Sequence, residues 1–133
     1  MRDLRLILLL SLLVIFSAPS FAIAQTDSAG EVIDAAVFHK EFNDNLFAAE
    51  EKYGGKEFTL KGAVGGIGRS MGGAPEVTIE VAPFKEIKCE FGPESKSQIA
   101  QLKKGDVITV KCQLNKGGKA IVGLNMCSFP TQQ

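Results

Sequence analysis

The most constraining feature of this chain is the segment Leu102–Cys112, LKKGDVITVKC. Gly105 supplies the positive φ that ends a helix at little cost, and the two lysines before it suit the negative end of a helix dipole. After Asp106 the apolar residues fall on alternate positions, as in a strand that buries one face. The segment predicts a helix end, a tight turn and a strand, and it contains no chemistry that would name a substrate.

The N-terminus has the layout of a secretory signal peptide. Basic residues precede an apolar run over 6–16, and Pro19 and the small-x-small pattern AIA at 22–24 follow. An uncleaved membrane anchor is the alternative, but the run is short for a membrane span and Pro19 would break its helix. We therefore expect residues 1–24 to be a signal peptide that is removed. The protein would then be periplasmic or secreted, with no stable membrane anchor.

The expected mature chain is small and almost neutral. Residues 25–133 suffice for one domain with a single core. The whole chain has 15 basic and 15 acidic residues, and the signal holds one more base than acid, which leaves a formal charge of −1. Such a domain has no global field that would attract nucleic acid or acidic lipid.

An apolar stripe at helical spacing predicts one amphipathic helix from about Asp34 to Tyr53. Asp34 is a plausible N-cap, because its carboxylate can accept hydrogen bonds from the first amides of the helix. Residues 25–33 before it are expected to form a flexible leader. The members of the stripe are Phe38, Phe42, Leu46, Ala49 and Tyr53.

The period then changes to two, which predicts strands. They are expected over 57–64, 77–81, 87–91, 107–114 and 120–129. Gly62 inside the first strand suggests a bend or a bulge. A glycine-rich connection at 65–75 follows that strand, a helix over 94–104 precedes the fourth, and the turn signal NKGG lies between the last two.

Three strands, a helix and two strands are the order of an OB-fold, a small Greek-key barrel. We therefore predict a mainly β chain, with a five-stranded OB-fold Greek-key barrel domain over residues 34–129. The N-terminal helix is an addition to it, the second helix lies between strands three and four, and residues 130–133 form a C-terminal tail. A two-layer α+β sandwich of the same elements is the alternative.

The opening segment is one of several short motifs along the expected mature chain. They are FNDN with KYGGK (42–45 and 52–56), LKGAVGGI (60–67), IKCEF (87–91), LKKGDVITVKC (102–112) and GLNMC (123–127). In their order and spacing they resemble the exported bacterial OB-fold proteins called tRNA_anti-like, which are often lipoproteins. The resemblance implies an OB barrel and an extracytoplasmic location, while the family name is not evidence for tRNA binding. Gln25 stands where lipoproteins have a cysteine, which favours a soluble protein.

The sequence offers no catalytic constellation. His39 lies among charged residues on the predicted helix and is expected to be solvated, and nothing brings it within hydrogen-bond reach of a cysteine nucleophile. The glycine-rich connection fails the phosphate-loop patterns, because Met71 stands at the third dinucleotide glycine and no GK[ST] follows. We expect no enzyme activity and no cofactor.

The barrel face and the 65–75 connection are the expected ligand site, because the loop between the first two strands of an OB barrel commonly binds ligands. Arg69, Ser70 and Met71 at the loop tip, with Lys61 and Lys88 on the strands, are the candidate binding residues. The alternative is a flexible hairpin with an exposed arginine. The expected partner is a protein, a peptide or a glycan.

A single-stranded nucleic acid is the rival ligand. Proteins that bind it place aromatic rings in a basic groove, and only Phe84 and Phe129, near strand ends, could offer an exposed ring. The outward positions of the first three strands hold no aromatic residue and alternate in charge. They are Thr59, Lys61, Ala63, Thr78, Glu80, Lys88 and Glu90.

The three cysteines, Cys89, Cys112 and Cys127, permit one disulfide in an oxidising compartment. Cys112–Cys127 spans the last hairpin and is the expected bridge, with Cys89 as a free thiol on the inward face of its strand. Cys127 has the opposite parity to Leu124, so the bridge requires a bulge between them. No CxxC pattern occurs and the only histidine is distant, so no metal site is expected.

Overall fold

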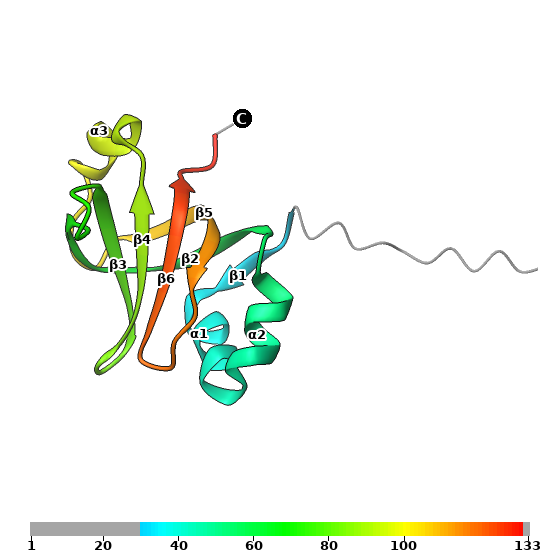
Figure 1. The fold of residues 1–133 in the computed structure, drawn as a ribbon. Helices are drawn as coiled ribbons and strands as arrows, with labels where there is room; N and C mark the ends of the chain where they lie inside the picture. Colours follow the sequence, from blue (N-terminus) through cyan, green and yellow to red (C-terminus); the bar gives the residue numbers. More distant parts are fainter. Residues whose placement is uncertain (1–29, 132–133) are drawn as a thin grey trace, which may run out of the picture.

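The computed structural model describes residues 30–131 (Figure 1). The expected signal peptide, residues 25–29 of the expected leader and residues 132–133 of the expected tail lie outside this range. Within 30–131, no helix has the length and apolar character needed to cross a membrane. The elements are β1 (Val32–Asp34), α1 (Ala35–Asp44), α2 (Leu46–Tyr53), β2 (Glu57–Arg69), β3 (Pro75–Ala82), β4 (Lys85–Phe91), η3 (Pro93–Ser95), α3 (Lys96–Ile99), β5 (Val107–Lys116) and β6 (Ile121–Ser128).

The strands close into a barrel. Their order is β1-β2-β3-β4-β6-β5, and a second pairing, between β2 and β5, closes the sheet on itself. The length of β2 makes this possible, because residues 57–63 pair with β5 and residues 64–69 pair with β3. β4 and β6 run parallel, while the other barrel pairs are antiparallel. The predicted five-stranded OB barrel is confirmed, and the two-layer sandwich is wrong.

β1 lies outside this barrel and pairs in parallel with residues 59–61 of β2. The sequence prediction placed residues 25–33 in a flexible leader, but Val32 and Ile33 belong to β1. Three residues are too few to show an alternating pattern, so no periodicity marked this strand.

The predicted N-terminal helix is two helices. Asn45 between them has an extended backbone, with φ −153°, and its side chain accepts a hydrogen bond from the amide of Ala48 at 3.1 Å. Asp34 caps α1 in the same way and accepts from the amide of Ala36 at 2.9 Å. The apolar stripe continues through the break, which is why its spacing did not reveal that Asn45 ends one helix and starts the next.

Four aromatic rings join the N-terminal helices to the barrel. Phe38 of α1 is fully buried, and its ring centroid lies 5.0 Å from Phe42, 4.7 Å from Tyr53 and 5.1 Å from Phe58. Phe58 belongs to β2, so the cluster spans both helices and the sheet. In Figure 1, α1 and α2 lie together on the side of the barrel away from α3.

β2 contains a bulge, but not at the predicted glycine. Its register against β3 shifts after Val64, which places the bulge at Gly65. A Cβ on Gly62 would lie 2.7 Å from Cγ2 of Ile79 and 2.8 Å from Cβ of Ala35. Gly62 therefore serves the close packing of α1 and β3 against β2 rather than a bulge.

A second bulge lies in β6 and turns Cys127 inward. β4 and β6 pair at Cys89 with Leu124 and next at Phe91 with Cys127, so β6 has one extra residue between these pairs. Met126 lies in this stretch with φ +50° and is 69% exposed. The bulge resolves the parity conflict in the sequence, since Leu124 and Cys127 are both buried.

The connection between β2 and β3 is shorter than predicted. β2 continues to Arg69, so only residues 70–74 lie between the strands, instead of 65–75. Gly66 and Gly68 favour a loop by propensity, but they pair with Thr78 and Glu76 of β3, and this pairing keeps them in the strand.

The helix predicted over 94–104 is also shorter, because α3 ends at Ile99. Lys103 lies in a turn, where its amide donates to Oδ2 of Asp106 at 2.8 Å. Gly105 has the expected positive φ, +93°, but it closes this turn rather than a helix. An aspartate side chain that accepts from the backbone three residues earlier competes with helix continuation, which the lysine pattern could not reveal.

Candidate functional site

One hollow on the barrel, about 520 Å³ in volume, collects most of the predicted ligand residues. Arg69, Ser70 and Met71 reach it from the β2–β3 connection, and Lys88 reaches it from β4. The β5–β6 hairpin forms the opposite wall. We call this space the barrel hollow; its lining is Arg69, Ser70, Met71, Glu76, Lys88, Glu90, Asn115, Lys116, Ile121, Gly123 and Leu124.

Strand pairing sets the floor of the barrel hollow. Glu76 of β3 lies opposite Glu90 of β4, and Lys88 lies opposite Gly123 of β6. A Cβ on Gly123 would make only ordinary contacts, the shortest at 3.6 Å to Cβ of Lys116. The fold therefore does not require glycine there, and the missing side chain leaves the floor open.

The barrel hollow carries charges of both signs. The cations of Arg69, Lys88 and Lys116 share the lining with the carboxylates of Glu76 and Glu90. Arg69 Nη1 donates to the carbonyl of Gly73 at 2.9 Å, so its guanidinium braces the loop that carries it. Lys88 Nζ lies 3.6 Å from Oε1 of Glu86, a half-exposed pair of small energetic weight. Such a surface suits a ligand that carries both signs of charge.

The β2–β3 loop offers a polar and an apolar contact to a ligand. Oγ of Ser70 is buried and has no hydrogen-bond partner among residues 30–131. A buried hydroxyl without a partner is unfavourable, and a ligand that hydrogen-bonds to it would remove that cost. Met71 at the tip is fully exposed, with a flexible side chain able to adapt to an apolar group.

Lys61 does not join the barrel hollow. It lies in the first half of β2, opposite Thr109 of β5 and Asp34 of β1, and its side chain is exposed there. Alternation correctly predicted that Lys61 points outward. It could not reveal that β2 curls around the barrel, so that its two halves face different directions.

The two rings proposed as exposed platforms lie away from this lining. Phe84 is 97% exposed, in the turn between β3 and β4, with φ +60°. Phe129 is half-buried and stacks on Phe91, with 4.9 Å between the ring centroids. Among the described residues, those that line the barrel hollow include no aromatic side chain.

His39 is buried, so the prediction of a solvated side chain is wrong. Only 2% of its surface is exposed, and its Nε2 lies 3.1 Å from the carbonyl oxygen of Ala120. The same oxygen accepts from the amide of Glu86 at 3.0 Å. His39 is thus on the apolar side of α1, three residues before Phe42. It ties α1 to the β5–β6 loop, whose flanking strand residues Lys116 and Ile121 line the barrel hollow.

Replacing His39 with alanine should lower the free energy of unfolding by about 1–3 kcal/mol, since a buried hydrogen bond and a buried ring are lost. Urea unfolding followed by circular dichroism measures this. Lys40→Ala is the matched control, because Lys40 is the exposed neighbour and makes only an ion pair with Asp44, worth at most about 0.5 kcal/mol. Equal losses in the two variants would contradict the structural role of His39.

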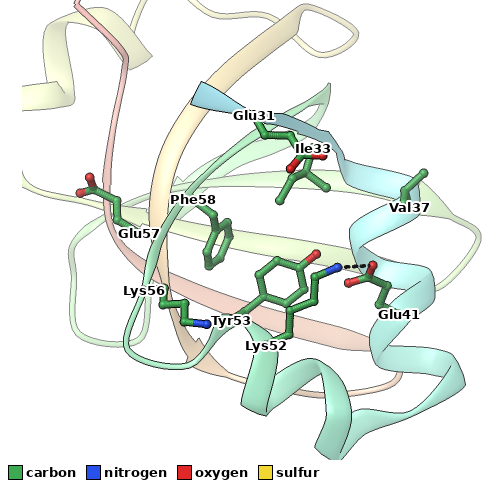
Figure 2. A pocket seen from close by; sticks show the side chains of 9 residues that line it. All are labelled: Glu31, Ile33, Val37, Glu41, Lys52, Tyr53, Lys56, Glu57 and Phe58. Atoms are coloured by element: carbon green, nitrogen blue, oxygen red, sulfur yellow. Dashed lines mark hydrogen bonds and ion pairs between the residues drawn. The ribbon is translucent and has the colours of Figure 1, made fainter. Parts of the chain in front are cut away.

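A second hollow, about 250 Å³ in volume, lies between the N-terminal helices and β2 (Figure 2). The rings of Tyr53 and Phe58 face it, and Lys52 Nζ lies 2.8 Å from Oε1 of Glu41 and 5.1 Å from the centroid of Tyr53. No sequence pattern predicted this hollow, because it forms only where the N-terminal segment, the helices and β2 pack together. Its lining is Glu31, Ile33, Val37, Glu41, Lys52, Tyr53, Lys56, Glu57 and Phe58.

The charged groups of the second hollow are largely paired with one another or with neighbours. Burial raises the pKa of Glu41, but hydrogen bonds to Lys52 and Tyr53 outweigh it and leave that pKa below its usual value. Burial, together with the Glu41 carboxylate, raises the pKa of Tyr53 to about 12, so its hydroxyl stays protonated. Glu57 pairs with Lys111 at 2.9 Å. Oε2 of Glu41 is buried without a hydrogen-bond partner among residues 30–131, as Oγ of Ser70 is, so this feature does not distinguish the two hollows. The barrel hollow is the stronger candidate because it is the larger of the two and collects four of the five predicted ligand residues.

Comparison with solved structures supports the barrel fold. The chain is similar to a crystal structure described as a "putative nucleic acid-binding lipoprotein" from Klebsiella pneumoniae subsp. pneumoniae MGH 78578, with a TM-score of 0.63 and 22% identity over 76% of this chain and 92% of that chain. A replication factor A related protein from Methanobacterium thermoautotrophicum matches with a TM-score of 0.42 and 17% identity, over 58% of this chain and 83% of that chain. At 22% identity the likeness to the Klebsiella protein concerns the fold alone.

Comparison by sequence identifies the family. No curated protein matches the chain. The family model tRNA_anti-like matches residues 4–128, which is nearly the whole sequence. The motif order, the closed five-stranded barrel and this match agree, and the chain belongs to the tRNA_anti-like family.

Proposed function

We propose that this protein is an exported, non-catalytic OB-fold module that binds a peptide segment or a protein surface in the barrel hollow. One observation carries the proposal. The β2–β3 loop, the β5–β6 hairpin and the strands between them surround a single open space, and these are the elements with which OB domains hold ligands. Export is supported by the layout of residues 1–24 and by the lipoprotein description of the similar Klebsiella protein.

The chemistry of the barrel hollow favours a ligand with both charges and many hydrogen-bonding groups. A peptide offers amides and carbonyls to Ser70 and Asn115, an apolar side chain to Met71, and charges of either sign to the cations and carboxylates of the lining. A polyanion would meet the carboxylates of Glu76 and Glu90, and like charges in contact oppose binding. A glycan would use the same hydrogen-bonding groups and is the alternative within this proposal.

Single-stranded nucleic acid is the second candidate. It is favoured by the nucleic acid-binding description of the Klebsiella protein and by the three cations in the barrel hollow. It is opposed by the lack of an aromatic platform in the described lining, because stacked bases supply much of the affinity in such grooves.

A variant that fills the hollow tests the proposal. Gly123→Leu places a branched side chain on the open floor, where a Cβ fits without a clash. We expect it to weaken binding at least about tenfold, or about 1.4 kcal/mol, by excluding the ligand. Fluorescence anisotropy against a library of mixed-charge peptides, cell-wall glycan fragments and a labelled oligothymidine measures this. Lys61→Ala is the matched control, since Lys61 is exposed outside the hollow, and its binding should stay within about twofold.

Each probe gives a different result. Peptide binding that Gly123→Leu abolishes supports the proposal, and glycan binding with the same response selects the alternative ligand. Oligothymidine binding that falls steeply with added salt would select the rival, because released counterions drive that association. Peptide binding that Gly123→Leu leaves unchanged would contradict the assignment of the barrel hollow as the site.

A further inference from the structure

Three sulfur atoms meet in the barrel core. The Sγ atoms of Cys89, Cys112 and Cys127 all lie within 4.8 Å of one another, and each residue is at most 2% exposed. The structure joins Cys112 to Cys127, whose Cα atoms are 4.1 Å apart, and leaves Cys89 as a buried thiol. A free thiol therefore lies next to a disulfide, and both are buried away from solvent.

The strand order gives Cys127 two possible partners. β6 lies between β4 and β5 in the sheet, and it carries Cys127, while its neighbours carry Cys89 and Cys112. The bulge around Met126 turns Cys127 toward the interior, where both other sulfurs lie. Cys127 can bond only one of them at a time.

We propose that this disulfide is movable, and that Cys89 and Cys112 exchange as the partner of Cys127. The Cys89 thiol first gives up its proton, and its sulfur then attacks Sγ of Cys127. The Cys89–Cys127 bond forms as the Cys112–Cys127 bond breaks, and the sulfur of Cys112 leaves as a thiolate that takes up a proton. One disulfide and one thiol exist before and after, so the step needs no oxidant and no reductant.

In the closed barrel, burial of the Cys89 thiol slows the exchange. Burial, with a smaller contribution from the Glu76 carboxylate on β3, raises the pKa of Cys89 to about 12. The titratable groups that β5 and β6 place next to Cys89 are the sulfurs of Cys112 and Cys127. Neither sulfur titrates while the two are joined in the disulfide. The thiolate is the attacking species, so the exchange requires a local opening of β4 or an alkaline medium.

The two positions of the bridge would constrain different parts of the barrel face. In the present form the bridge fastens the β5–β6 hairpin, which is a wall of the barrel hollow. In the exchanged form it would fasten β4, where Cys89 lies between Lys88 and Glu90 of the hollow floor. This inference rests on the cysteine geometry and stands whether or not the barrel hollow binds the proposed ligand.

Alkylation of the wild-type protein tests the exchange. Samples held at neutral pH and at about pH 10 are quenched in acid and unfolded in mildly acidic urea, so that the sealed thiol becomes accessible. They are then alkylated with N-ethylmaleimide and mapped by mass spectrometry without reduction. We expect the label on Cys89 at neutral pH and a rising share on Cys112 at alkaline pH. A label confined to Cys89 under both conditions would overturn the proposal.

Two matched variants test the choice of partner. Cys112→Ser keeps the proposed second pair, and we expect it to form a Cys89–Cys127 bridge in air while circular dichroism shows a folded barrel. Cys127→Ser removes the shared partner, and both of its thiols should remain open to alkylation after unfolding. The role of Cys127 would be overturned if the Cys112→Ser protein folded but kept two free thiols. It would also be overturned if a bridge formed as readily in Cys127→Ser. If Cys112→Ser does not fold, the wild-type alkylation pattern still decides.

Discussion

Replacing Phe38 with alanine should lower the free energy of unfolding by about 3–5 kcal/mol. The ring is fully buried at the centre of the cluster formed with Phe42, Tyr53 and Phe58, so the substitution removes its contacts with both helices and the sheet. A domain of this size has a total stability of about 5–15 kcal/mol, and the loss would therefore be a large share of it. Urea unfolding monitored by circular dichroism measures the change.

The same experiment shows whether the helices and the barrel unfold as one unit. Tyr53 is the only tyrosine and the chain has no tryptophan, so intrinsic fluorescence reports on this cluster. We expect fluorescence and circular dichroism to give coincident transitions in the wild type, because the cluster joins the helices to β2. Phe47→Ala is the control, since Phe47 is 78% exposed on α2 and its loss should change stability by less than about 0.5 kcal/mol. A fluorescence transition well before the circular dichroism transition would mean that the helices detach separately.

The strands were predictable because each buries one face and exposes the other. The change from a helical period to a period of two after Tyr53 placed the barrel strands to within a few residues, and their order gave the topology. The β6 bulge was also predictable, because Leu124 and Cys127 cannot both face inward on a regular strand. The fold was thus predictable from patterns that repeat along the chain and from conflicts within those patterns.

Features that depend on packing between distant segments were not predictable from periodicity. His39 looked solvated beside Lys40 and Glu41, but the β5–β6 loop covers it and accepts its hydrogen bond. Gly62 looked like a bulge, but Ala35 and Ile79 press on it from α1 and β3. In each case the contacting residue belongs to an element that is distant in the sequence. The pattern within one strand or one helix does not show which distant element will pack against it.

The candidate site was predictable to the extent that it follows from the fold. Arg69, Ser70 and Met71 of the β2–β3 connection and Lys88 of β4 line one hollow, and their role in binding a ligand stays a prediction. Lys61 was grouped with them on the assumption that all outward-pointing residues share one surface. In a closed barrel, outward-pointing residues face every direction around the barrel axis. The β5–β6 hairpin lines the same hollow because the barrel is closed. The order of the elements along the chain does not show on which side of the barrel this hairpin lies.

The free energy of unfolding should fall as pH rises from about 9 to about 12, through two buried groups. Burial raises the pKa of Cys89 from 9.0 to about 12, and burial with the Glu41 carboxylate raises that of Tyr53 from 10.0 to about 12. In this window the unfolded chain releases these protons while the folded chain retains them. The unfolded state then binds fewer protons, so stability decreases with pH, by an amount on the order of several kcal/mol in total.

Two variants separate the contributions of these groups. In Cys89→Ala the fall should begin near pH 10 instead of pH 9, because the remaining raised pKa values, those of Tyr53 and of the exposed Lys52, start from higher ordinary values than that of a thiol. In Tyr53→Phe the fall should begin near pH 9 but be shallower above pH 10. Urea unfolding at several pH values measures both, and the near-ultraviolet absorbance of tyrosinate follows Tyr53 directly. Titration acts at once, whereas movement of the disulfide would grow with time at alkaline pH. A loss between pH 9 and pH 10 that is immediate and equal in the wild type and in Cys89→Ala would contradict a protonated, sealed thiol in the barrel core.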